Sequence, residues 1–444
     1  YNARMTTPDV STAPASQDGA RSLRVLYFIG SYSPDLMGNV GHEQAILALK
    51  RRGHEVEVLT QINEPGVPRY SRTVYAGVPT YRVNLATFSG SVSGLLRRAA
   101  GRFLQYEHTF TLLAALRRHL KRHSYDLLHV EGVYPFGAVA ALGAGKTPYL
   151  ANAQGADVIE LPENDYGYRR FRLPRAAVGL ALRRAALVRV NSPFMIGYLV
   201  GERLAERERI VMVPRVLEDS AFPPVAAPLH EFRRESRARL SERYGIGLPN
   251  PVVMSLSRLH PFKGLEYLVD AMPLVAAEMR AIGRPVPWFV LCGPSRSTEH
   301  YGDYREFLQK RAAELGVAQH VIFTGQVAHP DVRRHLAGAD IVTSPSVVEA
   351  LHRVALEAAA VGTPTVVSET TGAASYLAPH DACMAVAPRS PQAIADAIIR
   401  LLSEADLYER VRDNGLKVAE GLRVEPVADQ LEAAWLRAAS ARSG

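Results

Sequence analysis

The chain has 444 residues, of which 47% are hydrophobic and 22% are charged, and its formal net charge is +8. This length and balance suit two or three globular domains with buried cores, and they exclude a wholly disordered, collagenous or disulfide-scaffold protein. The two cysteines, Cys292 and Cys383, stand in apolar runs, which fits a reducing compartment.

Residues 1–22 are rich in small and polar residues and lack the apolar stretch of a signal peptide, so we expect a disordered tail there. No uncharged run reaches the roughly 18 residues that a transmembrane helix needs. These features predict a cytoplasmic protein.

Short β-branched runs alternate with longer amphipathic segments from residue 23 to residue 216, a pattern typical of βαβ units with a parallel sheet. The predicted strands are 24–29, 55–59, 126–130, 148–151, 187–190 and 210–213, and the predicted helices include 41–52 and 103–123. We expect residues 23–216 to form one doubly wound, Rossmann-like domain.

A proline-rich stretch with a charged helix at 231–244 interrupts this rhythm, and we interpret residues 217–251 as an interdomain linker. The same alternation then restarts. The predicted strands are 252–256, 288–292, 321–323, 340–343, 365–367 and 384–386, and the predicted helices are 265–277, 304–315, 330–337, 354–361 and 391–402. We expect a second doubly wound α/β domain at 252–425, and a final amphipathic helix within 426–444.

The first chemical motif is the run from Ser257 to Gly264, which follows a predicted strand and opens a helix. It contains Arg258 and Lys263, two cations five positions apart. A helix start supplies free amides and a favourable dipole, and arginine binds phosphate oxygens in a fork, so the pattern suits a diphosphate. Taken alone, a solvated turn with two surface cations explains this run at least as well.

The second motif runs from Glu349 to Glu357 and follows the predicted strand 340–343. Glu349 is predicted in a loop and Glu357 in the first turns of a helix, so the two carboxylates can reach different parts of one ligand. Carboxylates accept hydrogen bonds from sugar hydroxyls. For either acid alone, stabilisation of the helix dipole is the simpler explanation.

In this order and at this separation, the two motifs resemble those of the nucleotide-sugar-dependent retaining glycosyltransferases of family 4 (group 1). The resemblance covers most of residues 23–402 and implies the GT-B fold, with two Rossmann-like domains that face each other across a cleft. It implies that Arg258 and Lys263 bind the donor diphosphate. It also implies that Glu349 contacts the donor sugar and Glu357 the ribose. The other implied contacts are the amides of Leu351, His352, Arg353 and Val354 at the sugar and phosphate, and Gln326 and Val327 at the nucleobase.

The N-terminal half resembles this family more loosely. A glycine loop before the first predicted helix contains Gly38 and Gly41, which are separated here although the family tends to have them adjacent. Glycines there would let backbone amides approach the donor phosphate, and an ordinary strand-to-helix turn is the alternative. His129 ends a predicted strand and could bind acceptor or phosphate, although a lone histidine is more often satisfied structurally.

Two departures from the family pattern bear on the donor. The run from Gln154 to Asp157 stands where the family often has His, Gly, any residue and Asp, so Gln154 replaces the His. In the family, that His contacts the donor sugar and phosphate. A glutamine can form hydrogen bonds but cannot carry charge, so the donor sugar or the rate can differ. In the loop of the acid pair, Ala350 and His352 replace glycines that are common in the family.

Basic residues gather in two groups of predicted helices. They are Arg97, Arg98, Arg102, Arg117, Arg118, Lys121 and Arg122, and Arg169, Arg170, Arg172, Arg175, Arg183 and Arg184. Such helices indicate peripheral contact with an anionic membrane or an anionic acceptor, with solvated helix faces as the alternative. We find no nucleic-acid-binding module and expect no nucleic acid as a partner.

The resemblance therefore implies a metal-independent, retaining glycosyltransferase whose catalytic residues are Arg258, Lys263 and Glu349. Its substrates would be a nucleoside diphosphate sugar, with UDP-sugars favoured over GDP-mannose, and a hydroxyl acceptor. We expect no cofactor, and a location in the cytoplasm or at the inner face of the membrane. A nucleotide-sugar 2-epimerase and a non-catalytic sugar-nucleotide-binding protein remain as alternatives.

Overall fold

The computed structural model describes residues 21–33, 39–87, 91–298 and 300–441. The first half of the chain forms an eight-stranded sheet in the order β3-β4-β2-β1-β5-β6-β7-β8. All neighbouring strands are parallel except β3, which is antiparallel to β4. The strands are β1 (Arg24–Phe28), β2 (Glu55–Ile62), β3 (Tyr70–Tyr75), β4 (Val78–Asn84), β5 (Leu127–Glu131), β6 (Tyr149–Ala153), β7 (Leu187–Val190) and β8 (Ile210–Met212).

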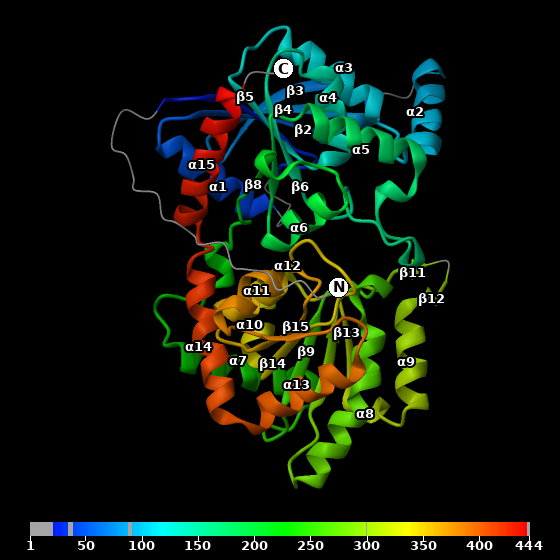
Figure 1. Cartoon of the computed structure of the whole chain (residues 1–444), viewed down its shortest axis with the longest axis vertical. Helices are drawn as coiled ribbons and strands as arrows, with labels where there is room; N and C mark the ends of the chain where they lie inside the picture. The colour runs from blue at the N-terminus through cyan, green and yellow to red at the C-terminus, as the bar shows by residue number, and fades with distance from the viewer. Residues whose placement is uncertain (1–20, 34–38, 88–90, 299, 442–444) are drawn as a thin grey trace.

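Helices cover both faces of this sheet (Figure 1). They are α1 (Val40–Arg51), α2 (Ser91–Leu104), α3 (Thr109–Leu120), α4 (Ala138–Gly143), α5 (Arg172–Arg184) and α6 (Pro193–Gly201). Alternate residues of a strand point to opposite faces, and β1 shows the result. Its Leu26 and Phe28 pack with α3, α4 and α5, whereas Val25 and Tyr27 pack on the side of α1. A sheet buried on both faces requires the near-continuous apolar strands of this sequence.

The second half forms a six-stranded, fully parallel sheet in the order β13-β10-β9-β14-β15-β16. Its strands are β9 (Val252–Leu256), β10 (Trp288–Cys292), β13 (Val321–Gly325), β14 (Ile341–Ser344), β15 (Thr365–Ser368) and β16 (Met384–Val386). A small antiparallel pair, β11 (Ser297–Thr298) and β12 (Gly302–Asp303), lies outside the sheet. The helices are α7 (Leu229–Tyr244), α8 (Leu265–Ala281), α9 (Tyr304–Glu314), α10 (His329–Gly338), α11 (Arg353–Ala360), α12 (Gly372–Leu377), α13 (Pro391–Ser403), α14 (Ala405–Glu420) and α15 (Val424–Ser440).

The segment predicted as a linker, 217–251, is not a free connection. Its first part is packed, because Leu217, Ala221 and Phe222 share a core with residues of α11 and α12. Helix α7 packs along α10, and its Phe232 and Leu240 share a core with Val252 and Met254 of β9. The helix therefore belongs to the second α/β unit. The sequence did not indicate this packing, because the apolar residues of α7 are few and widely spaced and prolines precede the helix.

The last helix, α15, returns to the first unit, where it lies beside α1 (Figure 1). Its Val427, Leu431 and Trp435 join the core that contains Val25 and Tyr27 of β1. Ion pairs from Arg52 at the end of α1 to Glu425, Asp429 and Glu432 fix its polar side. Within the described residues, no helix combines the length and the apolar character needed to cross a bilayer.

Candidate active site

Each sheet has one point where its strand order reverses, between β1 and β5 in the first and between β9 and β14 in the second. Loops leave the two strands in opposite directions there, which opens a crevice where ligands bind in folds of this kind. The two predicted motifs follow β9 and β14, so they flank the switch point of the second sheet.

Lys263 is positioned by a short 3₁₀ turn, Pro261–Lys263, shortly after β9. The turn ends at Gly264, whose φ of +64° is the left-handed conformation that glycine adopts freely. A Cβ at Gly264 would collide with the carbonyl oxygen of Pro345, so the loops after β9 and β14 touch. The Lys263 ammonium lies 2.6 and 2.7 Å from the two carboxylate oxygens of Glu349. The structure thus joins the second cation of the first motif to the first acid of the second.

Glu349 is a buried carboxylate with two partners besides Lys263. Ser346 Oγ donates to it at 3.0 Å, and His352 Nδ1 lies 2.7 Å from the same oxygen. Burial alone would raise the pKa of Glu349, but the charges and hydrogen bonds of Lys263 and His352 outweigh burial and hold this pKa far below its ordinary value. Glu349 is therefore a permanent anion, a poor proton acceptor but a good hydrogen-bond acceptor for hydroxyl groups.

His352 forms the N-terminal boundary of α11 and has a φ of +57°. This left-handed conformation costs a non-glycine residue about 1–2 kcal/mol. The position therefore favours glycine. The residue is 5% exposed, and its Nε2 has no hydrogen-bond partner among the described residues. His352 thus adds a buried polar atom beside Glu349.

Glu357 belongs to a second ionic group on α11. Arg353 Nε lies 2.7 Å from Glu357 Oε1, and the same guanidinium contacts Glu218 in the segment between the two sheets. The Glu218 side chain is 1% exposed. Glu349 and Glu357 are therefore paired with different cations, Lys263 and Arg353. Glu357 also lies next to the connection between the two units.

Arg258 is exposed, in contrast to Lys263. Within the described part of the chain its guanidinium has no hydrogen bond or ion pair. The charge of Arg258 nonetheless affects its neighbour His260. Burial is the main cause that lowers the pKa of His260 to about 4, and the positive charge of Arg258 is the second. An uncompensated cation beside a buried lysine suits an anionic ligand.

Gln154 and Asp157 follow β6 in the first unit. The Asp157 carboxylate accepts hydrogen bonds from the amides of Gln154 and Gly155, at 3.0 and 2.7 Å, and from that of Val133 at 2.8 Å. Asp157 is 5% exposed, so its side chain shapes the loop and offers little to a ligand. The Gln154 side chain is exposed at its outer end and donates to Glu131.

The placement of His129 differs from the expected contact with acceptor or phosphate. The residue is fully buried, and its two ring nitrogens lie 2.9 Å from Glu131 Oε1 and 2.7 Å from Trp435 Nε1. Neither nitrogen is left for a ligand. The strand end was recognisable from the sequence, but its burial under α15 was not, because Trp435 is 306 positions away.

Side chains from both units meet around the loop of the acid pair. Ser192 Oγ donates to the carbonyl oxygen of Ala350, and the rings of Tyr166 and Phe262 stack with their centroids 4.3 Å apart. A Cβ on Gly155 would lie 3.5 Å from Ala350 Cβ. The Gln154 loop therefore faces the Glu349 loop across the boundary between the units.

The other predicted contact residues have varied surroundings. Gly38 lies outside the described residues, and Gly41 is in the first turn of α1, where a Cβ would be 3.3 Å from the Val216 carbonyl oxygen. Leu351 is buried in a core, so only its backbone can serve a ligand. Val354 is partly buried against a core, Gln326 is exposed, and Val327 is partly buried.

Sequence reasoning missed Glu131, Ser346 and Glu218 as parts of this region. Glu131 stands two positions after His129 at a strand end, so both side chains lie on the same face of β5, which was a usable signal. Glu218 and Ser346 carry no local pattern, since their roles arise only from tertiary contacts.

Two family models match the chain. Residues 40–215 match "Glycosyl transferase 4-like domain", and residues 236–418 match "Glycosyl transferases group 1". A Bacillus subtilis protein named as a teichuronic acid biosynthesis glycosyltransferase, TuaC, is 25% identical over 420 residues, which span 88% of this chain and 94% of that protein.

Two further likenesses differ in reach. The GDP-mannose-dependent alpha-(1-6)-phosphatidylinositol monomannoside mannosyltransferase of Mycobacterium tuberculosis is 35% identical over 204 residues, or 42% of this chain and half of that enzyme. The structure of Anabaena HepE, solved with UDP and glucose, superimposes with a TM-score of 0.67 at 19% identity, covering 93% of this chain and 99% of that one. Because the family models take in both α/β units and the structural likeness extends over both, the chain belongs to the group 1 glycosyl transferases and has the GT-B fold.

Proposed function

We propose that this glycosyltransferase moves a sugar from a UDP-sugar, or failing that GDP-mannose, to a hydroxyl acceptor with retention of the anomeric configuration and without a metal. The ion pair between Lys263 and Glu349 carries the proposal, because it brings a phosphate-binding cation and a hydroxyl-binding anion to one switch point. A nucleotide sugar presents both complementary groups on adjacent atoms. The family match favours transfer over the epimerase and the non-catalytic binding protein.

In the proposed reaction, the bond between the anomeric carbon and the diphosphate oxygen breaks while the acceptor oxygen bonds to the same carbon. Negative charge grows on the leaving diphosphate. Lys263 and exposed Arg258 would neutralise that charge, and Glu349 would orient the sugar through its hydroxyls. The acceptor proton moves to the departing phosphate oxygen, which leaves on the same face of the sugar.

Retention by this route needs no protein base. Glu349, the acid nearest Lys263, is held as an anion by Lys263 and His352, so it is a poor base and a poor nucleophile. Glu357 is engaged by Arg353. Both observations support a mechanism in which the phosphate takes the proton.

Metal independence rests on the same cations. Arg258 and Lys263 supply the positive charge that a divalent ion would otherwise bring to the diphosphate.

A thermal-shift panel of UDP, GDP and ADP, each with and without its sugar, tests the donor, because a ligand of the native form raises the unfolding temperature. HepE was solved with UDP, and the mannosyltransferase relative is named for GDP-mannose. We expect UDP and UDP-sugars to give the largest shift. Absence of a shift with all nucleotides, together with no transfer, would contradict the proposed function.

We also propose that the enzyme contacts an anionic membrane surface where its acceptor lies. The last turn of α3 and the two residues after it present Arg117, Arg118, Lys121 and Arg122. Arg118 and Arg122 line a hollow of about 220 Å³ together with Arg72 and Arg82 of the β3–β4 pair. Within the described residues, none of these cations has a carboxylate within 4 Å. In the second basic group, by contrast, Arg169, Arg170 and Arg175 pair with acids.

We therefore assign membrane contact to α3. Vesicle sedimentation with neutral lipid and with 30% anionic lipid tests it, using Arg118→Glu/Arg122→Glu and, as the control, Arg170→Glu. Binding that depends on anionic lipid and is lost only in the α3 variant supports the assignment. Equal sedimentation of all proteins contradicts it.

A further inference from the structure

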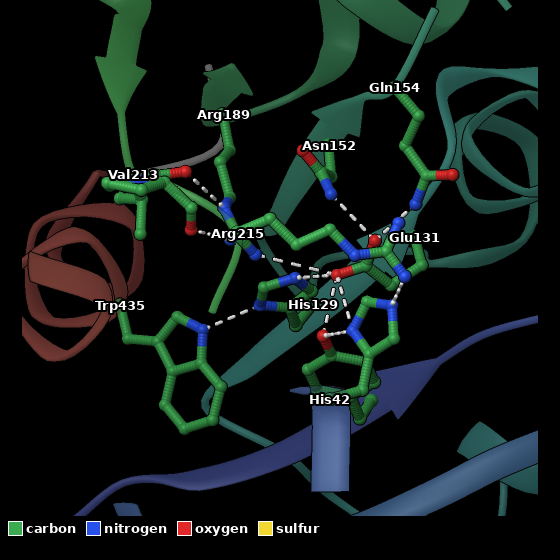
Figure 2. Close-up of polar contacts among 11 residues, drawn as sticks. His42, His129, Glu131, Asn152, Gln154, Arg189, Val213, Arg215 and Trp435 are labelled. Atoms are coloured by element: carbon green, nitrogen blue, oxygen red, sulfur yellow. Dashed lines mark hydrogen bonds and ion pairs between the residues drawn. The ribbon is translucent and has the colours of Figure 1, made fainter. Parts of the chain in front are cut away.

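The Glu131 carboxylate, at the end of β5, is the centre of a buried polar network (Figure 2). The residue is 3% exposed. Hydrogen-bond donors reach it from β1, β5, β6 and the loop after β6, and Arg189 of β7 lies 3.5 Å away. Burial would raise the pKa of Glu131, but His42, His129 and Arg189 outweigh burial and hold this pKa well below its ordinary value. Glu131 is thus an anion that only accepts hydrogen bonds.

The C-terminal helix sets the protonation of one donor. Trp435 Nε1 lies 2.7 Å from His129 Nδ1, and an indole nitrogen can only donate. Nδ1 must therefore be unprotonated, which leaves the proton on Nε2, 2.9 Å from Glu131 Oε1. Burial lowers the pKa of His129, in keeping with a neutral ring. Trp435 thus fixes His129 as a donor to Glu131 (Figure 2).

A second chain of hydrogen bonds orients the neighbouring side chains. The Tyr27 hydroxyl donates to Glu131 Oε1 at 2.6 Å, so its oxygen is left to accept from His42 Nδ1 at 2.8 Å. His42 Nε2 then faces Arg215 Nη2 at 3.4 Å as an acceptor. The donor and acceptor of each hydrogen bond in this series are therefore determined, because the series begins at a carboxylate, which can only accept.

The other Glu131 oxygen determines how Gln154 lies. It accepts from Asn152 Nδ2 at 2.6 Å and from the amide nitrogen of Gln154. A carboxylate cannot receive the carbonyl end of an amide, so the Gln154 carbonyl oxygen must point away from Glu131, as Figure 2 shows. Gln154 is consequently not free to turn its amide over.

Gln154 lines a small cavity together with other amide side chains. Asn152 and Asn191 also line it, and they are 5% and 6% exposed. Their Oδ1 atoms are buried without a hydrogen-bond partner among the described residues. The cavity holds about 20 Å³, which is enough for a water-sized group and too little for a phosphate. Unsatisfied carbonyl oxygens in so small a space call for one small hydrogen-bond donor, which a water molecule or a hydroxyl can supply.

We infer that Gln154 is a specificity-determining residue whose carbonyl oxygen accepts a hydrogen bond from a sugar hydroxyl, and that Glu131, His129 and Trp435 are positioning residues for it. The inference rests on the proposed function, because the sugar comes from the donor or the acceptor of that reaction. A histidine at this position can donate to a phosphate oxygen, whereas the fixed Gln154 carbonyl repels one. Gly155, the residue after Gln154, adjoins Ala350, which is next to Glu349. The hydroxyl would therefore bind close to the reacting sugar.

Gln154→Leu tests the ligand, with titrations of UDP and of UDP-sugars and with KM for the acceptor. One lost hydrogen bond corresponds to about a five- to tenfold weaker interaction. We expect UDP affinity to stay unchanged. A weaker UDP-sugar identifies the hydroxyl as the donor's, and a raised acceptor KM identifies it as the acceptor's. Loss of UDP affinity, or no change in any of these values, overturns the inference.

Trp435→Phe tests the positioning role without touching the site. ¹⁵N spectra of histidine should show His129 with a bare Nδ1 and a protonated Nε2 in the wild type, and a changed Nδ1 signal in the variant. The same KM or affinity that responds to Gln154→Leu should shift in the same direction, by a smaller factor. Leu436→Ala is the control, because it loosens α15 outside the lining of the cavity but keeps the indole.

If Leu436→Ala produces the same KM shift as Trp435→Phe, the effect is packing and the positioning role is wrong. A wild-type His129 with a protonated Nδ1 would also overturn it. These spectra need no ligand, so they remain decisive even if no nucleotide binds and the proposed function itself fails.

Discussion

Lys263 and Glu349 are 86 positions apart in the chain, and their charged groups meet at 2.6 Å on the two sides of a topological switch point. Both side chains are largely buried, with 10% and 19% of their surfaces exposed. A buried lysine would be costly on its own, so Glu349 stabilises Lys263 until a ligand arrives. The pair therefore serves both stability and binding, and substitutions can separate these two roles.

Lys263→Met should abolish most transfer and also lower stability, because it leaves Glu349 unpaired. Loss of one charge-stabilising donor typically costs about 10²–10³ in rate. Breaking a buried pair typically costs about 3–5 kcal/mol, and here we expect the lower end because Ser346 and His352 still contact Glu349. The double variant Lys263→Met/Glu349→Gln should recover stability in urea denaturation but remain inactive. Recovery of activity in the double variant would show that Lys263 has only a structural role.

Arg258→Ala should reduce transfer by a similar factor with an unchanged unfolding temperature. Arg258 is exposed and its guanidinium is unpaired within the described residues, so the folded protein loses no hydrogen bond or ion pair. Arg239→Ala, at an exposed arginine on α7 in the same unit, is the matched control and should change neither the transfer rate nor the unfolding temperature. Steady-state kinetics and differential scanning fluorimetry measure both effects. Wild-type turnover of Arg258→Ala would remove this residue from the diphosphate site.

Dialysis against EDTA should leave the initial rate of transfer within about twofold of the untreated enzyme, because protein cations take the role of a divalent ion. Restoration of a lost rate by Mg²⁺ or Mn²⁺ would contradict the cation-pair mechanism. A parallel assay at high ionic strength is informative, since screening weakens exposed Arg258 more than buried Lys263.

The sequence predicted most of the parallel framework. Strands expected at 187–190, 252–256, 288–292 and 384–386 have those bounds in the structure. Buried parallel strands are short apolar runs, so the signal is strong. The β3–β4 hairpin was missed, although its two-residue turn at Ala76 and Gly77, both with positive φ, is typical of hairpins. Its strands are half exposed and therefore more polar.

The site was predictable where a motif is local and unpredictable where it is tertiary. Arg258, Lys263, Glu349 and Glu357 each follow a strand at recognisable spacing. The network around Glu131 depends instead on a helix at the far end of the chain, because Trp435 reaches His129 from α15. No spacing rule connects residues whose contact is made only by the docking of α15.

Stability should fall as the pH drops from 7.5 to 5.5. Burial lowers the pKa of His42 to about 3 and that of His119 to about 4. The unfolded chain takes up a proton on each ring near its usual pKa of about 6.5, whereas the folded protein does not, so acid favours unfolding. Each histidine should remove about 1.4 kcal/mol from the free energy of unfolding over this range.

Urea denaturation at the two pH values measures the loss, with Trp435 fluorescence as the reporter of the first unit in a Trp288→Phe background. Other buried histidines add to the wild-type loss, so the informative quantity is its reduction in a variant. His119→Gln should make the loss about 1.4 kcal/mol smaller than in the parent. His123→Gln, at a neighbouring and partly exposed ring, is the control and should leave the loss nearly unchanged. Equal pH dependence of His119→Gln and the parent would mean that His119 can take up a proton in the folded state.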